Sequence, residues 1–131
     1  MRAVYLTARL EENNKIFVDL KPVDMDDEPE DVCLEIEHIM GVDKLMYTHV
    51  LVHGQEFMCV YNPRAKMPPS LHTPEGAVLY GDAMIFSKND NGGLASLSGG
   101  GEKFLYQHLK ETIREAIDID GAAETRDFSR E

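Results

Sequence analysis

One proline-rich stretch, YNPRAKMPPSLHTPEG at residues 61–76, constrains the fold of this chain more than any other feature. It holds four of the six prolines of the chain. A proline fixes its own φ angle, donates no backbone hydrogen bond and restricts the preceding residue to extended conformations. The stretch is therefore predicted to be an ordered, extended surface loop that is neither a helix nor a central strand.

Short runs of β-branched and aromatic residues on both sides of this stretch predict strands. The runs AVYLTARL and KIFVDLKPV, separated by EENN, predict an N-terminal hairpin. KLMYTHVLV and EFMCVYN, joined by HGQ, predict a second hairpin, because a short glycine-bearing link joins antiparallel strands. AVLYGDAMIFS is predicted to be one strand with a central glycine, and LASLS a short last strand.

Two segments have apolar residues at helical spacing. The first, residues 29–40, has Pro29 in its first turn and Gly41 just past its end, and its apolar stripe comprises Val32, Ile36, Ile39 and Met40, with Cys33 beside it. The second extends from Glu102 to about Asp118, with Ser98 or a glycine as its cap. The resulting order β-β-α-β-β-β-α predicts an α+β fold, in which two helices pack on a mixed, mainly antiparallel sheet. Residues 1–119 are predicted to form a single domain, and residues 120–131 a flexible acidic tail.

The charge of the chain is concentrated in one window. The net charge is -11, and residues 24–37 contain eight acidic residues and no basic residue: Asp24, Asp26, Asp27, Glu28, Glu30, Asp31, Glu35 and Glu37. A field of this sign repels nucleic acid and anionic lipid and favours a basic partner protein. The absence of any apolar span of about 20 residues predicts no membrane segment. The two cysteines, Cys33 and Cys59, are predicted to be buried reduced thiols, which indicates a cytoplasmic protein.

No residue pattern predicts a metal site. His49 and His53 share one face of a predicted strand, but the strand rise separates them by about 13 Å, and His72 and Glu56 are only loosely placed third ligands. The pair is therefore interpreted as two polar residues on a sheet face. The acidic window resembles a calcium loop in charge alone, because Pro29 stands where such a loop requires glycine.

The other candidate sites likewise predict no specific ligand or reaction. The segment SGGGEK, with Ser98, Gly99, Gly100, Gly101 and Lys103, leads into a helix and is either an anion-binding turn or, more commonly, a flexible joint. Cys59 lies in a packing context, and Asp82 is interpreted as marking a bulge beside Gly81. No catalytic residue and no cofactor are predicted, and the chain is expected to be non-enzymatic.

The order of elements and several short strings resemble the domain of unknown function 3846 family. The strings are AVYL, EIEHIMG, VYN, YGDAMIF and SLS, and the likeness covers roughly residues 2–110. Proteins of this family are small and frequent in phages and other mobile elements, and the resemblance implies no established activity. It therefore supplies no catalytic residue.

Two functional hypotheses follow. The first is an accessory protein of a phage or mobile element that binds a basic host protein in the host cytosol through the acidic residues 24–37, with a possible anti-defence role. The alternative is a small-ligand or nucleotide-binding protein that uses SGGGEK with Arg64 and Lys66. Arg64 and Lys66 also project from a proline-stiffened loop on an acidic body, which suggests a homodimer with this loop at the interface. Shielding of a sheet edge in a monomer is an equal alternative.

Overall fold

The computed structural model describes residues 1–11, 15–25, 29–42, 44–120 and 127–130. Within these ranges the chain forms nine strands and two helices. The strands are β1 (Arg2–Leu10), β2 (Lys15–Asp24), β3 (Met46–Val52), β4 (Gln55–Tyr61), β5 (Pro69–His72), β6 (Val78–Tyr80), β7 (Ala83–Lys88), β8 (Leu94–Ala95) and β9 (Asp127–Arg130); the helices are α1 (Pro29–Met40) and α2 (Gly99–Asp120).

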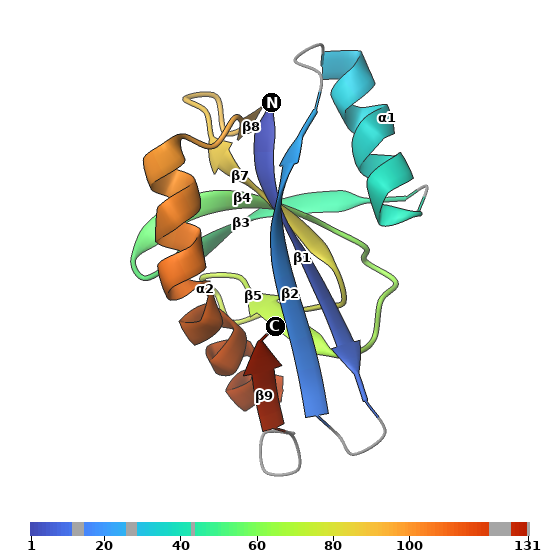
Figure 1. Cartoon of the computed structure of the whole chain (residues 1–131), viewed down its shortest axis with the longest axis vertical. Coiled ribbons are helices and arrows are strands. Elements are labelled where there is room, and N and C mark those ends of the chain that lie inside the picture. The colour runs from blue at the N-terminus through green and yellow to red at the C-terminus, as the bar shows by residue number, and fades with distance from the viewer. Residues whose placement is uncertain (12–14, 26–28, 43, 121–126, 131) are drawn as a thin grey trace.

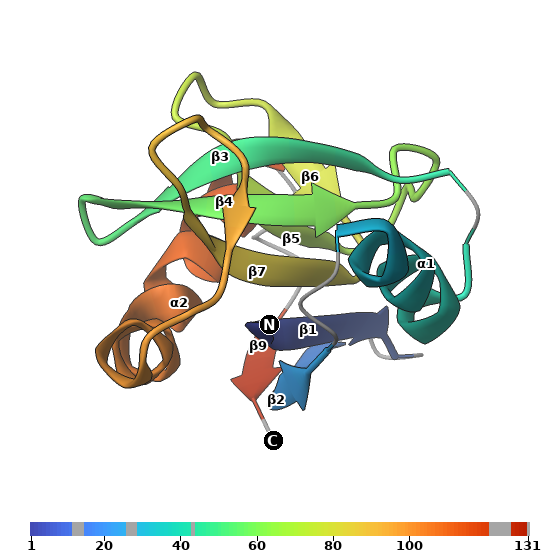
Figure 2. The same cartoon turned by 90° about the horizontal axis from the view of Figure 1, so that it is seen from above.

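The main sheet lies between the two helices. Its strand order is β3-β4-β7-β1-β2-β9, and β8 pairs with β7 at one end of that strand. The pairings are antiparallel except that β9 runs parallel to β2. Figures 1 and 2 show α1 and α2 on opposite faces of this twisted sheet. The predicted α+β class with an antiparallel sheet and two helices is confirmed.

Strand periodicity produces two separate cores. Successive side chains of a strand point to opposite faces, so Val4 and Leu6 of β1 join the core under α2, whereas Ala3 and Tyr5 join the core under α1. The α2 core is the larger, and it receives Leu105, Leu109, Ile113 and Ile117 from the buried stripe of that helix. The α1 core receives Val32 and Ile36.

Local sequence signals explain how several elements begin and end. The N–H of Gly41 donates to the carbonyl of Glu37 (2.9 Å) with φ at 73°, which ends α1 in a left-handed cap. Ser98 Oγ accepts from the N–H of Gly101 (3.0 Å) and caps α2, as predicted. Both predicted hairpins form, and His53 and Gly54 join β3 to β4 with positive φ angles of 49° and 80°.

The proline-rich stretch differs from its prediction. Residues 69–72 form β5, which pairs with β6 in a separate two-stranded sheet and packs against α2 with Leu71 fully buried. Proline is tolerated here because Pro69 is the first residue of a strand with a single neighbour, so its missing N–H interrupts no central ladder. The part before β5, which carries the exposed Arg64 and Lys66, and the turn after β5, which carries the exposed Pro74 and Glu75, are loop.

The segment AVLYGDAMIFS also differs, because it forms two strands in two sheets. Gly81 adopts a φ of 78° between β6 and β7, and a side chain there would come within 3.0 Å of the Cβ of Ala65. The carboxylate of Asp82 then accepts hydrogen bonds from the N–H of Ala8 (3.0 Å) and the hydroxyl of Tyr5 (3.3 Å). Asp82 therefore anchors the start of β7 to β1, which is a more specific role than marking a bulge.

The C-terminal half contains two further corrections. The helix predicted from Glu102 begins at Gly99, so the three glycines form its first turn and are not a joint before it. The helix continues to Asp120, and residues 127–130 of the predicted flexible tail form β9 beside β2. β9 pairs with the edge of β2, so the backbone N–H and C=O groups on that edge find partners. The sequence of residues 127–130 alone does not predict this pairing. The observed order is β-β-α-β-β-β-β-β-β-α-β.

Candidate functional site

The predicted acidic surface is distributed over the end of β2, α1 and the segment between them. Asp24 ends β2 and pairs with the guanidinium of Arg2 (2.7 Å), so its charge is already engaged within the chain. Asp26, Asp27 and Glu28 lie outside the described residues. Glu30 and Asp31 belong to α1, although the structure does not describe their side chains. Glu35 and Glu37 are half-buried on the same helix.

Arg2 is the centre of the ion pairs that connect the start of the sheet to α2. Its guanidinium also donates to the carboxylate of Glu102 from Nε (3.0 Å) and from a terminal nitrogen (3.1 Å). The hydrogen bond to Glu102, followed by the charges of Asp24 and Glu102, raises the pKa of Arg2. This bidentate contact ties β1 to the first turn of α2.

Helix α1 turns its apolar stripe inward only in part. Val32 and Ile36 are buried, as predicted, whereas Ile39 and Met40 are only half-buried against the same core. Cys33 is exposed, contrary to the prediction that both cysteines are buried. The reason is geometric, because one residue on from Val32 is a rotation of about 100° around the helix, which takes Cys33 off the buried stripe.

An apolar groove of about 550 Å³ lies between α1 and strands β3 and β4. Its lining combines residues from the helix, the sheet and the segment after β4: Cys33, Ile36, Glu37, Lys44, Leu45, Met46, Tyr47, Val60, Pro63 and Leu94. Met46 and Tyr47 remain 53% and 64% exposed at its edge. On the outer side of α1, Leu34 is 65% exposed. Exposed apolar side chains that gather around an apolar groove are typical of interaction sites.

The structure does not bring together the two parts of the predicted ligand site. Pro63, next to Arg64, lies in the wall of the groove beside α1. Figures 1 and 2 place the first turn of α2, with Gly99, Gly100 and Gly101, on the opposite side of the sheet. Arg64, Lys66 and Lys103 are exposed, as is Ser98. The described side chains of SGGGEK and of the proline-rich loop therefore do not converge on one ligand.

The two thiols differ in their environment. Cys59 is fully buried in β4, and burial raises the pKa of its thiol to about 12, which keeps it protonated at neutral pH. A thiol in this state is a poor nucleophile, as its predicted packing role requires. Cys33, by contrast, is an accessible thiol in the wall of the groove.

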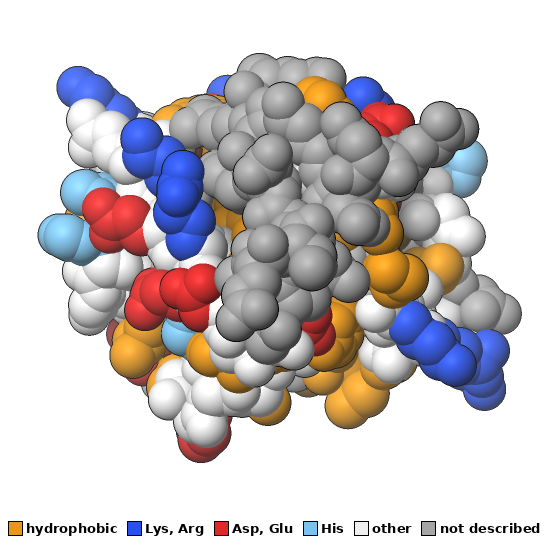
Figure 3. Space-filling model, turned by 90° about the horizontal axis from the view of Figure 1, so that it is seen from below, with side chains coloured by type: hydrophobic (Ala, Val, Ile, Leu, Met, Phe, Trp, Pro, Cys, Tyr) orange, Lys and Arg blue, Asp and Glu red, His pale blue; other side chains and the backbone are white. Residues whose placement is uncertain are grey.

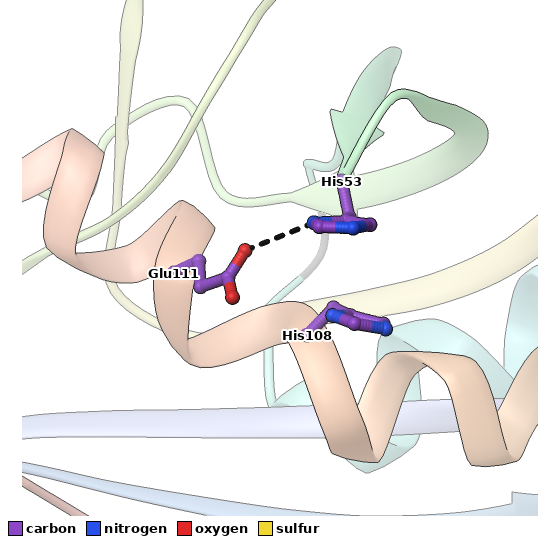
Figure 4. Close-up of side chains that lie close together, drawn as sticks. All are labelled: His53, His108 and Glu111. Carbon is purple, nitrogen blue, oxygen red and sulfur yellow. Dashed lines mark hydrogen bonds and ion pairs between the residues drawn. The ribbon is translucent and has the colours of Figure 1, made fainter.

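A cluster that the sequence analysis missed lies at the β3–β4 turn. Figure 4 shows the imidazole of His53 above that of His108, with the carboxylate of Glu111 directed at His53. The Nδ1 of His53 is 3.1 Å from an oxygen of Glu111, and the two rings stack with centroids 4.1 Å apart at 12°. One potential ligand atom from each residue lies within 4.8 Å of the others. Figure 3 shows histidine and acidic side chains side by side at the left margin of the molecule.

The prediction that His49 and His53 share one strand face is wrong, because β3 ends at Val52 and His53 lies in the turn that follows. His49 and His53 belong to one hairpin, whereas the partners of His53 come from α2. The available signal is His108 and Glu111, which are three residues apart and so share one helix face. Only the contact between α2 and the β3–β4 hairpin brings His53 to that face.

Comparison of the chain with family models, curated proteins and solved structures finds no match in any of the three. Among the described helices, none combines the length and the apolar character needed to cross a membrane.

Proposed function

We propose that this chain is a non-enzymatic binding protein that holds an apolar side chain of a partner protein in the groove between α1 and strands β3 and β4. The observation that carries the proposal is the combination of this groove with exposed Met46 and Tyr47 at its edge. Interfaces concentrate their binding energy in pockets filled by a few anchoring side chains, and tyrosine and methionine are enriched there.

The net charge of the chain, -11, favours a basic partner. In the groove itself Glu37 and Lys44 contribute one charge of each sign, and Glu35 lies on the helix that forms one wall. Complementary charge steers association and selects the partner, whereas apolar contacts at the centre supply most of the affinity. The partner segment we propose therefore has one large apolar side chain flanked by lysine or arginine.

The extent of the exposed apolar surface favours a protein over a small ligand. The volume of the groove lies within the range of small-molecule pockets, roughly 300–1,000 Å³. However, Leu34 lies outside the groove lining and Tyr47 is largely exposed at its edge, so a ligand confined to the groove would leave this surface uncovered. A protein segment covers both.

The resemblance to the domain of unknown function 3846 family gives this proposal a setting. If the chain belongs to a phage or other mobile element, its partner is a host protein in the host cytosol, and an anti-defence role follows from occupying a basic host surface. This setting remains part of the proposal. The binding mode does not depend on it.

The test is affinity capture from the natural host with three forms of the protein. Tyr47→Lys places a cation at the groove, and Ile119→Lys makes a comparable change at an apolar side chain that is 47% exposed on α2, on the other face of the sheet. We expect a protein that the wild type and Ile119→Lys capture and that Tyr47→Lys does not.

Binding is then measured with the purified partner. We expect the partner to slow alkylation of Cys33, which lies in the groove wall, and to bind more weakly as salt is raised. Reversal of Asp26, Asp27, Glu30 and Asp31 to lysine is expected to weaken binding while the protein stays folded. Equal capture by Tyr47→Lys and the wild type would contradict the proposal, as would a small molecule that copurifies and alone protects Cys33.

A further inference from the structure

We infer that His53, His108 and Glu111 form a binding site for one divalent transition-metal cation of the zinc class. These residues lie on the α2 face of the sheet, away from the groove on the α1 face. Three observations support the site: the donor types, the way the fold holds them together, and a buried nitrogen with no hydrogen-bond partner among the described residues.

The donor set matches the preference of zinc. Two imidazole nitrogens and one carboxylate oxygen are a known three-ligand combination, in which water or another group takes the fourth tetrahedral position. Zinc bonds of about 2.0–2.1 Å place tetrahedral ligand atoms about 3.4 Å apart. The three ligand atoms already lie within 4.8 Å, and the side chains of His53 and Glu111 are more than half exposed and free to rotate inward.

The donors come from two parts of the fold, helix α2 and the β3–β4 turn. His108 and Glu111 are three residues apart on α2 and therefore share a face of the helix. His53 lies at the first position of a tight turn, where its φ of 49° directs the side chain over that face. Phe104 lies one turn earlier on α2, and the centroid of its ring is 4.6 Å from that of His108 and 6.0 Å from that of Phe57. The ligands therefore lie against an apolar wall.

The Nδ1 atom of His108 distinguishes this cluster from an ordinary surface ion pair. This atom is buried, and it makes no hydrogen bond to any described group. The hydrogen bond between His53 and Glu111 accounts for two members of the cluster and does not involve this nitrogen. A buried polar atom without a partner is costly, so it calls for an explanation. A cation bound to Nδ1 itself would give this atom a partner, and a metal bond also fixes the tautomer and the orientation of the ring.

Such a cation would join α2 to the β3–β4 turn. A ligand that binds only the folded chain stabilises it, so addition of Zn²⁺ should raise the melting temperature. Because three protein ligands leave a coordination position open, a group from another molecule can complete the site.

The experiment titrates the metal-free full-length chain with Zn²⁺ alone, in competition with a chromogenic chelator. We expect one saturable site per chain, a higher melting temperature and selective shifts of the imidazole NMR signals of His53 and His108. The variants are His53→Asn, Glu111→Gln and His108→Gln. Asparagine at position 53 tolerates the positive φ of the turn, and Glu111 is exposed, so these two variants test the site even if His108→Gln unfolds. His49→Gln is the control, because it removes a histidine from the same hairpin outside the cluster.

Each variant in the cluster should weaken Zn²⁺ binding by at least about tenfold, since even the loss of an outer-shell partner costs that much. His49→Gln should bind as the wild type does. The inference is overturned if the wild type shows no saturable site, if any folded cluster variant retains wild-type affinity, or if His49→Gln weakens binding to the same extent. None of these results depends on a partner protein, so they leave the proposed groove function untouched.

Discussion

Replacement of one isoleucine on each helix would test whether the core beneath α1 opens into a groove while the core beneath α2 is closed. Ile36 of α1 and Ile113 of α2 are 3% and 0% exposed, so burial alone predicts similar effects on stability. Their surroundings differ, however. Ile36 forms part of the wall of the apolar groove, whereas Ile113 lies in the larger core beneath α2.

The expected magnitudes follow from this difference. Ile→Ala removes three carbon groups, and the lost transfer free energy is about 2.4 kcal/mol at about 0.8 kcal/mol for each. At Ile113 a closed cavity adds to this, for a total of about 3–5 kcal/mol. At Ile36 the space opens into the groove and adds little, so we expect about 2–3 kcal/mol. With a guanidinium m-value of about 4 kcal/mol/M, the midpoints should fall by about 1 M and about 0.6 M.

Equilibrium denaturation in guanidinium chloride, followed by circular dichroism, measures both values. Leu34→Ala is the control on α1, because this side chain is exposed and its loss should change stability by no more than about 0.5 kcal/mol. A midpoint for Ile36→Ala as low as that of Ile113→Ala would refute the open groove. An unchanged midpoint would refute the assigned inner face of α1.

Three further results are expected. In the native protein a thiol reagent should titrate one rapidly reacting cysteine, Cys33, and should reach Cys59 only after unfolding; Cys33→Ser should remove the rapid phase. The free energy of unfolding should fall as the pH rises from about 9 to about 12. Burial raises the pKa of Cys59 from 9.0 to about 12 and that of Tyr5 from 10.0 to about 12, so the unfolded chain loses these protons first. If the free energy of unfolding of Cys59→Ala fell as steeply with pH as that of the wild type, this cause would be contradicted. Light scattering at low salt should show a dimer that is lost when Arg64 and Lys66 are both changed to Glu; a monomer at tens of micromolar, or a dimer that persists in the variant, would exclude the predicted loop-mediated homodimer.

Local signals predicted the elements that are determined within a few residues. The β3–β4 hairpin follows from two apolar runs around HGQ, and the limits of α1 follow from Pro29 and Gly41. The prediction failed where a distant segment decides the outcome. β5 is a strand because β6 pairs with it and α2 covers it, and β9 is a strand because β2 offers it an edge. Neither partner can be inferred from the residues of the segment itself.

The candidate sites divide in the same way. The sequence by itself determined the charge of the chain, the placement of acidic residues on α1 and the packing role of Cys59, because these depend on composition and on the period of one element. Only the tertiary structure decided that Cys33 faces outward into a groove, that the first turn of α2 and the proline-rich loop lie apart, and that His53 meets His108 and Glu111. Each of these depends on the contact of two elements far apart in the chain, and the spacing of residues along one element does not predict that contact.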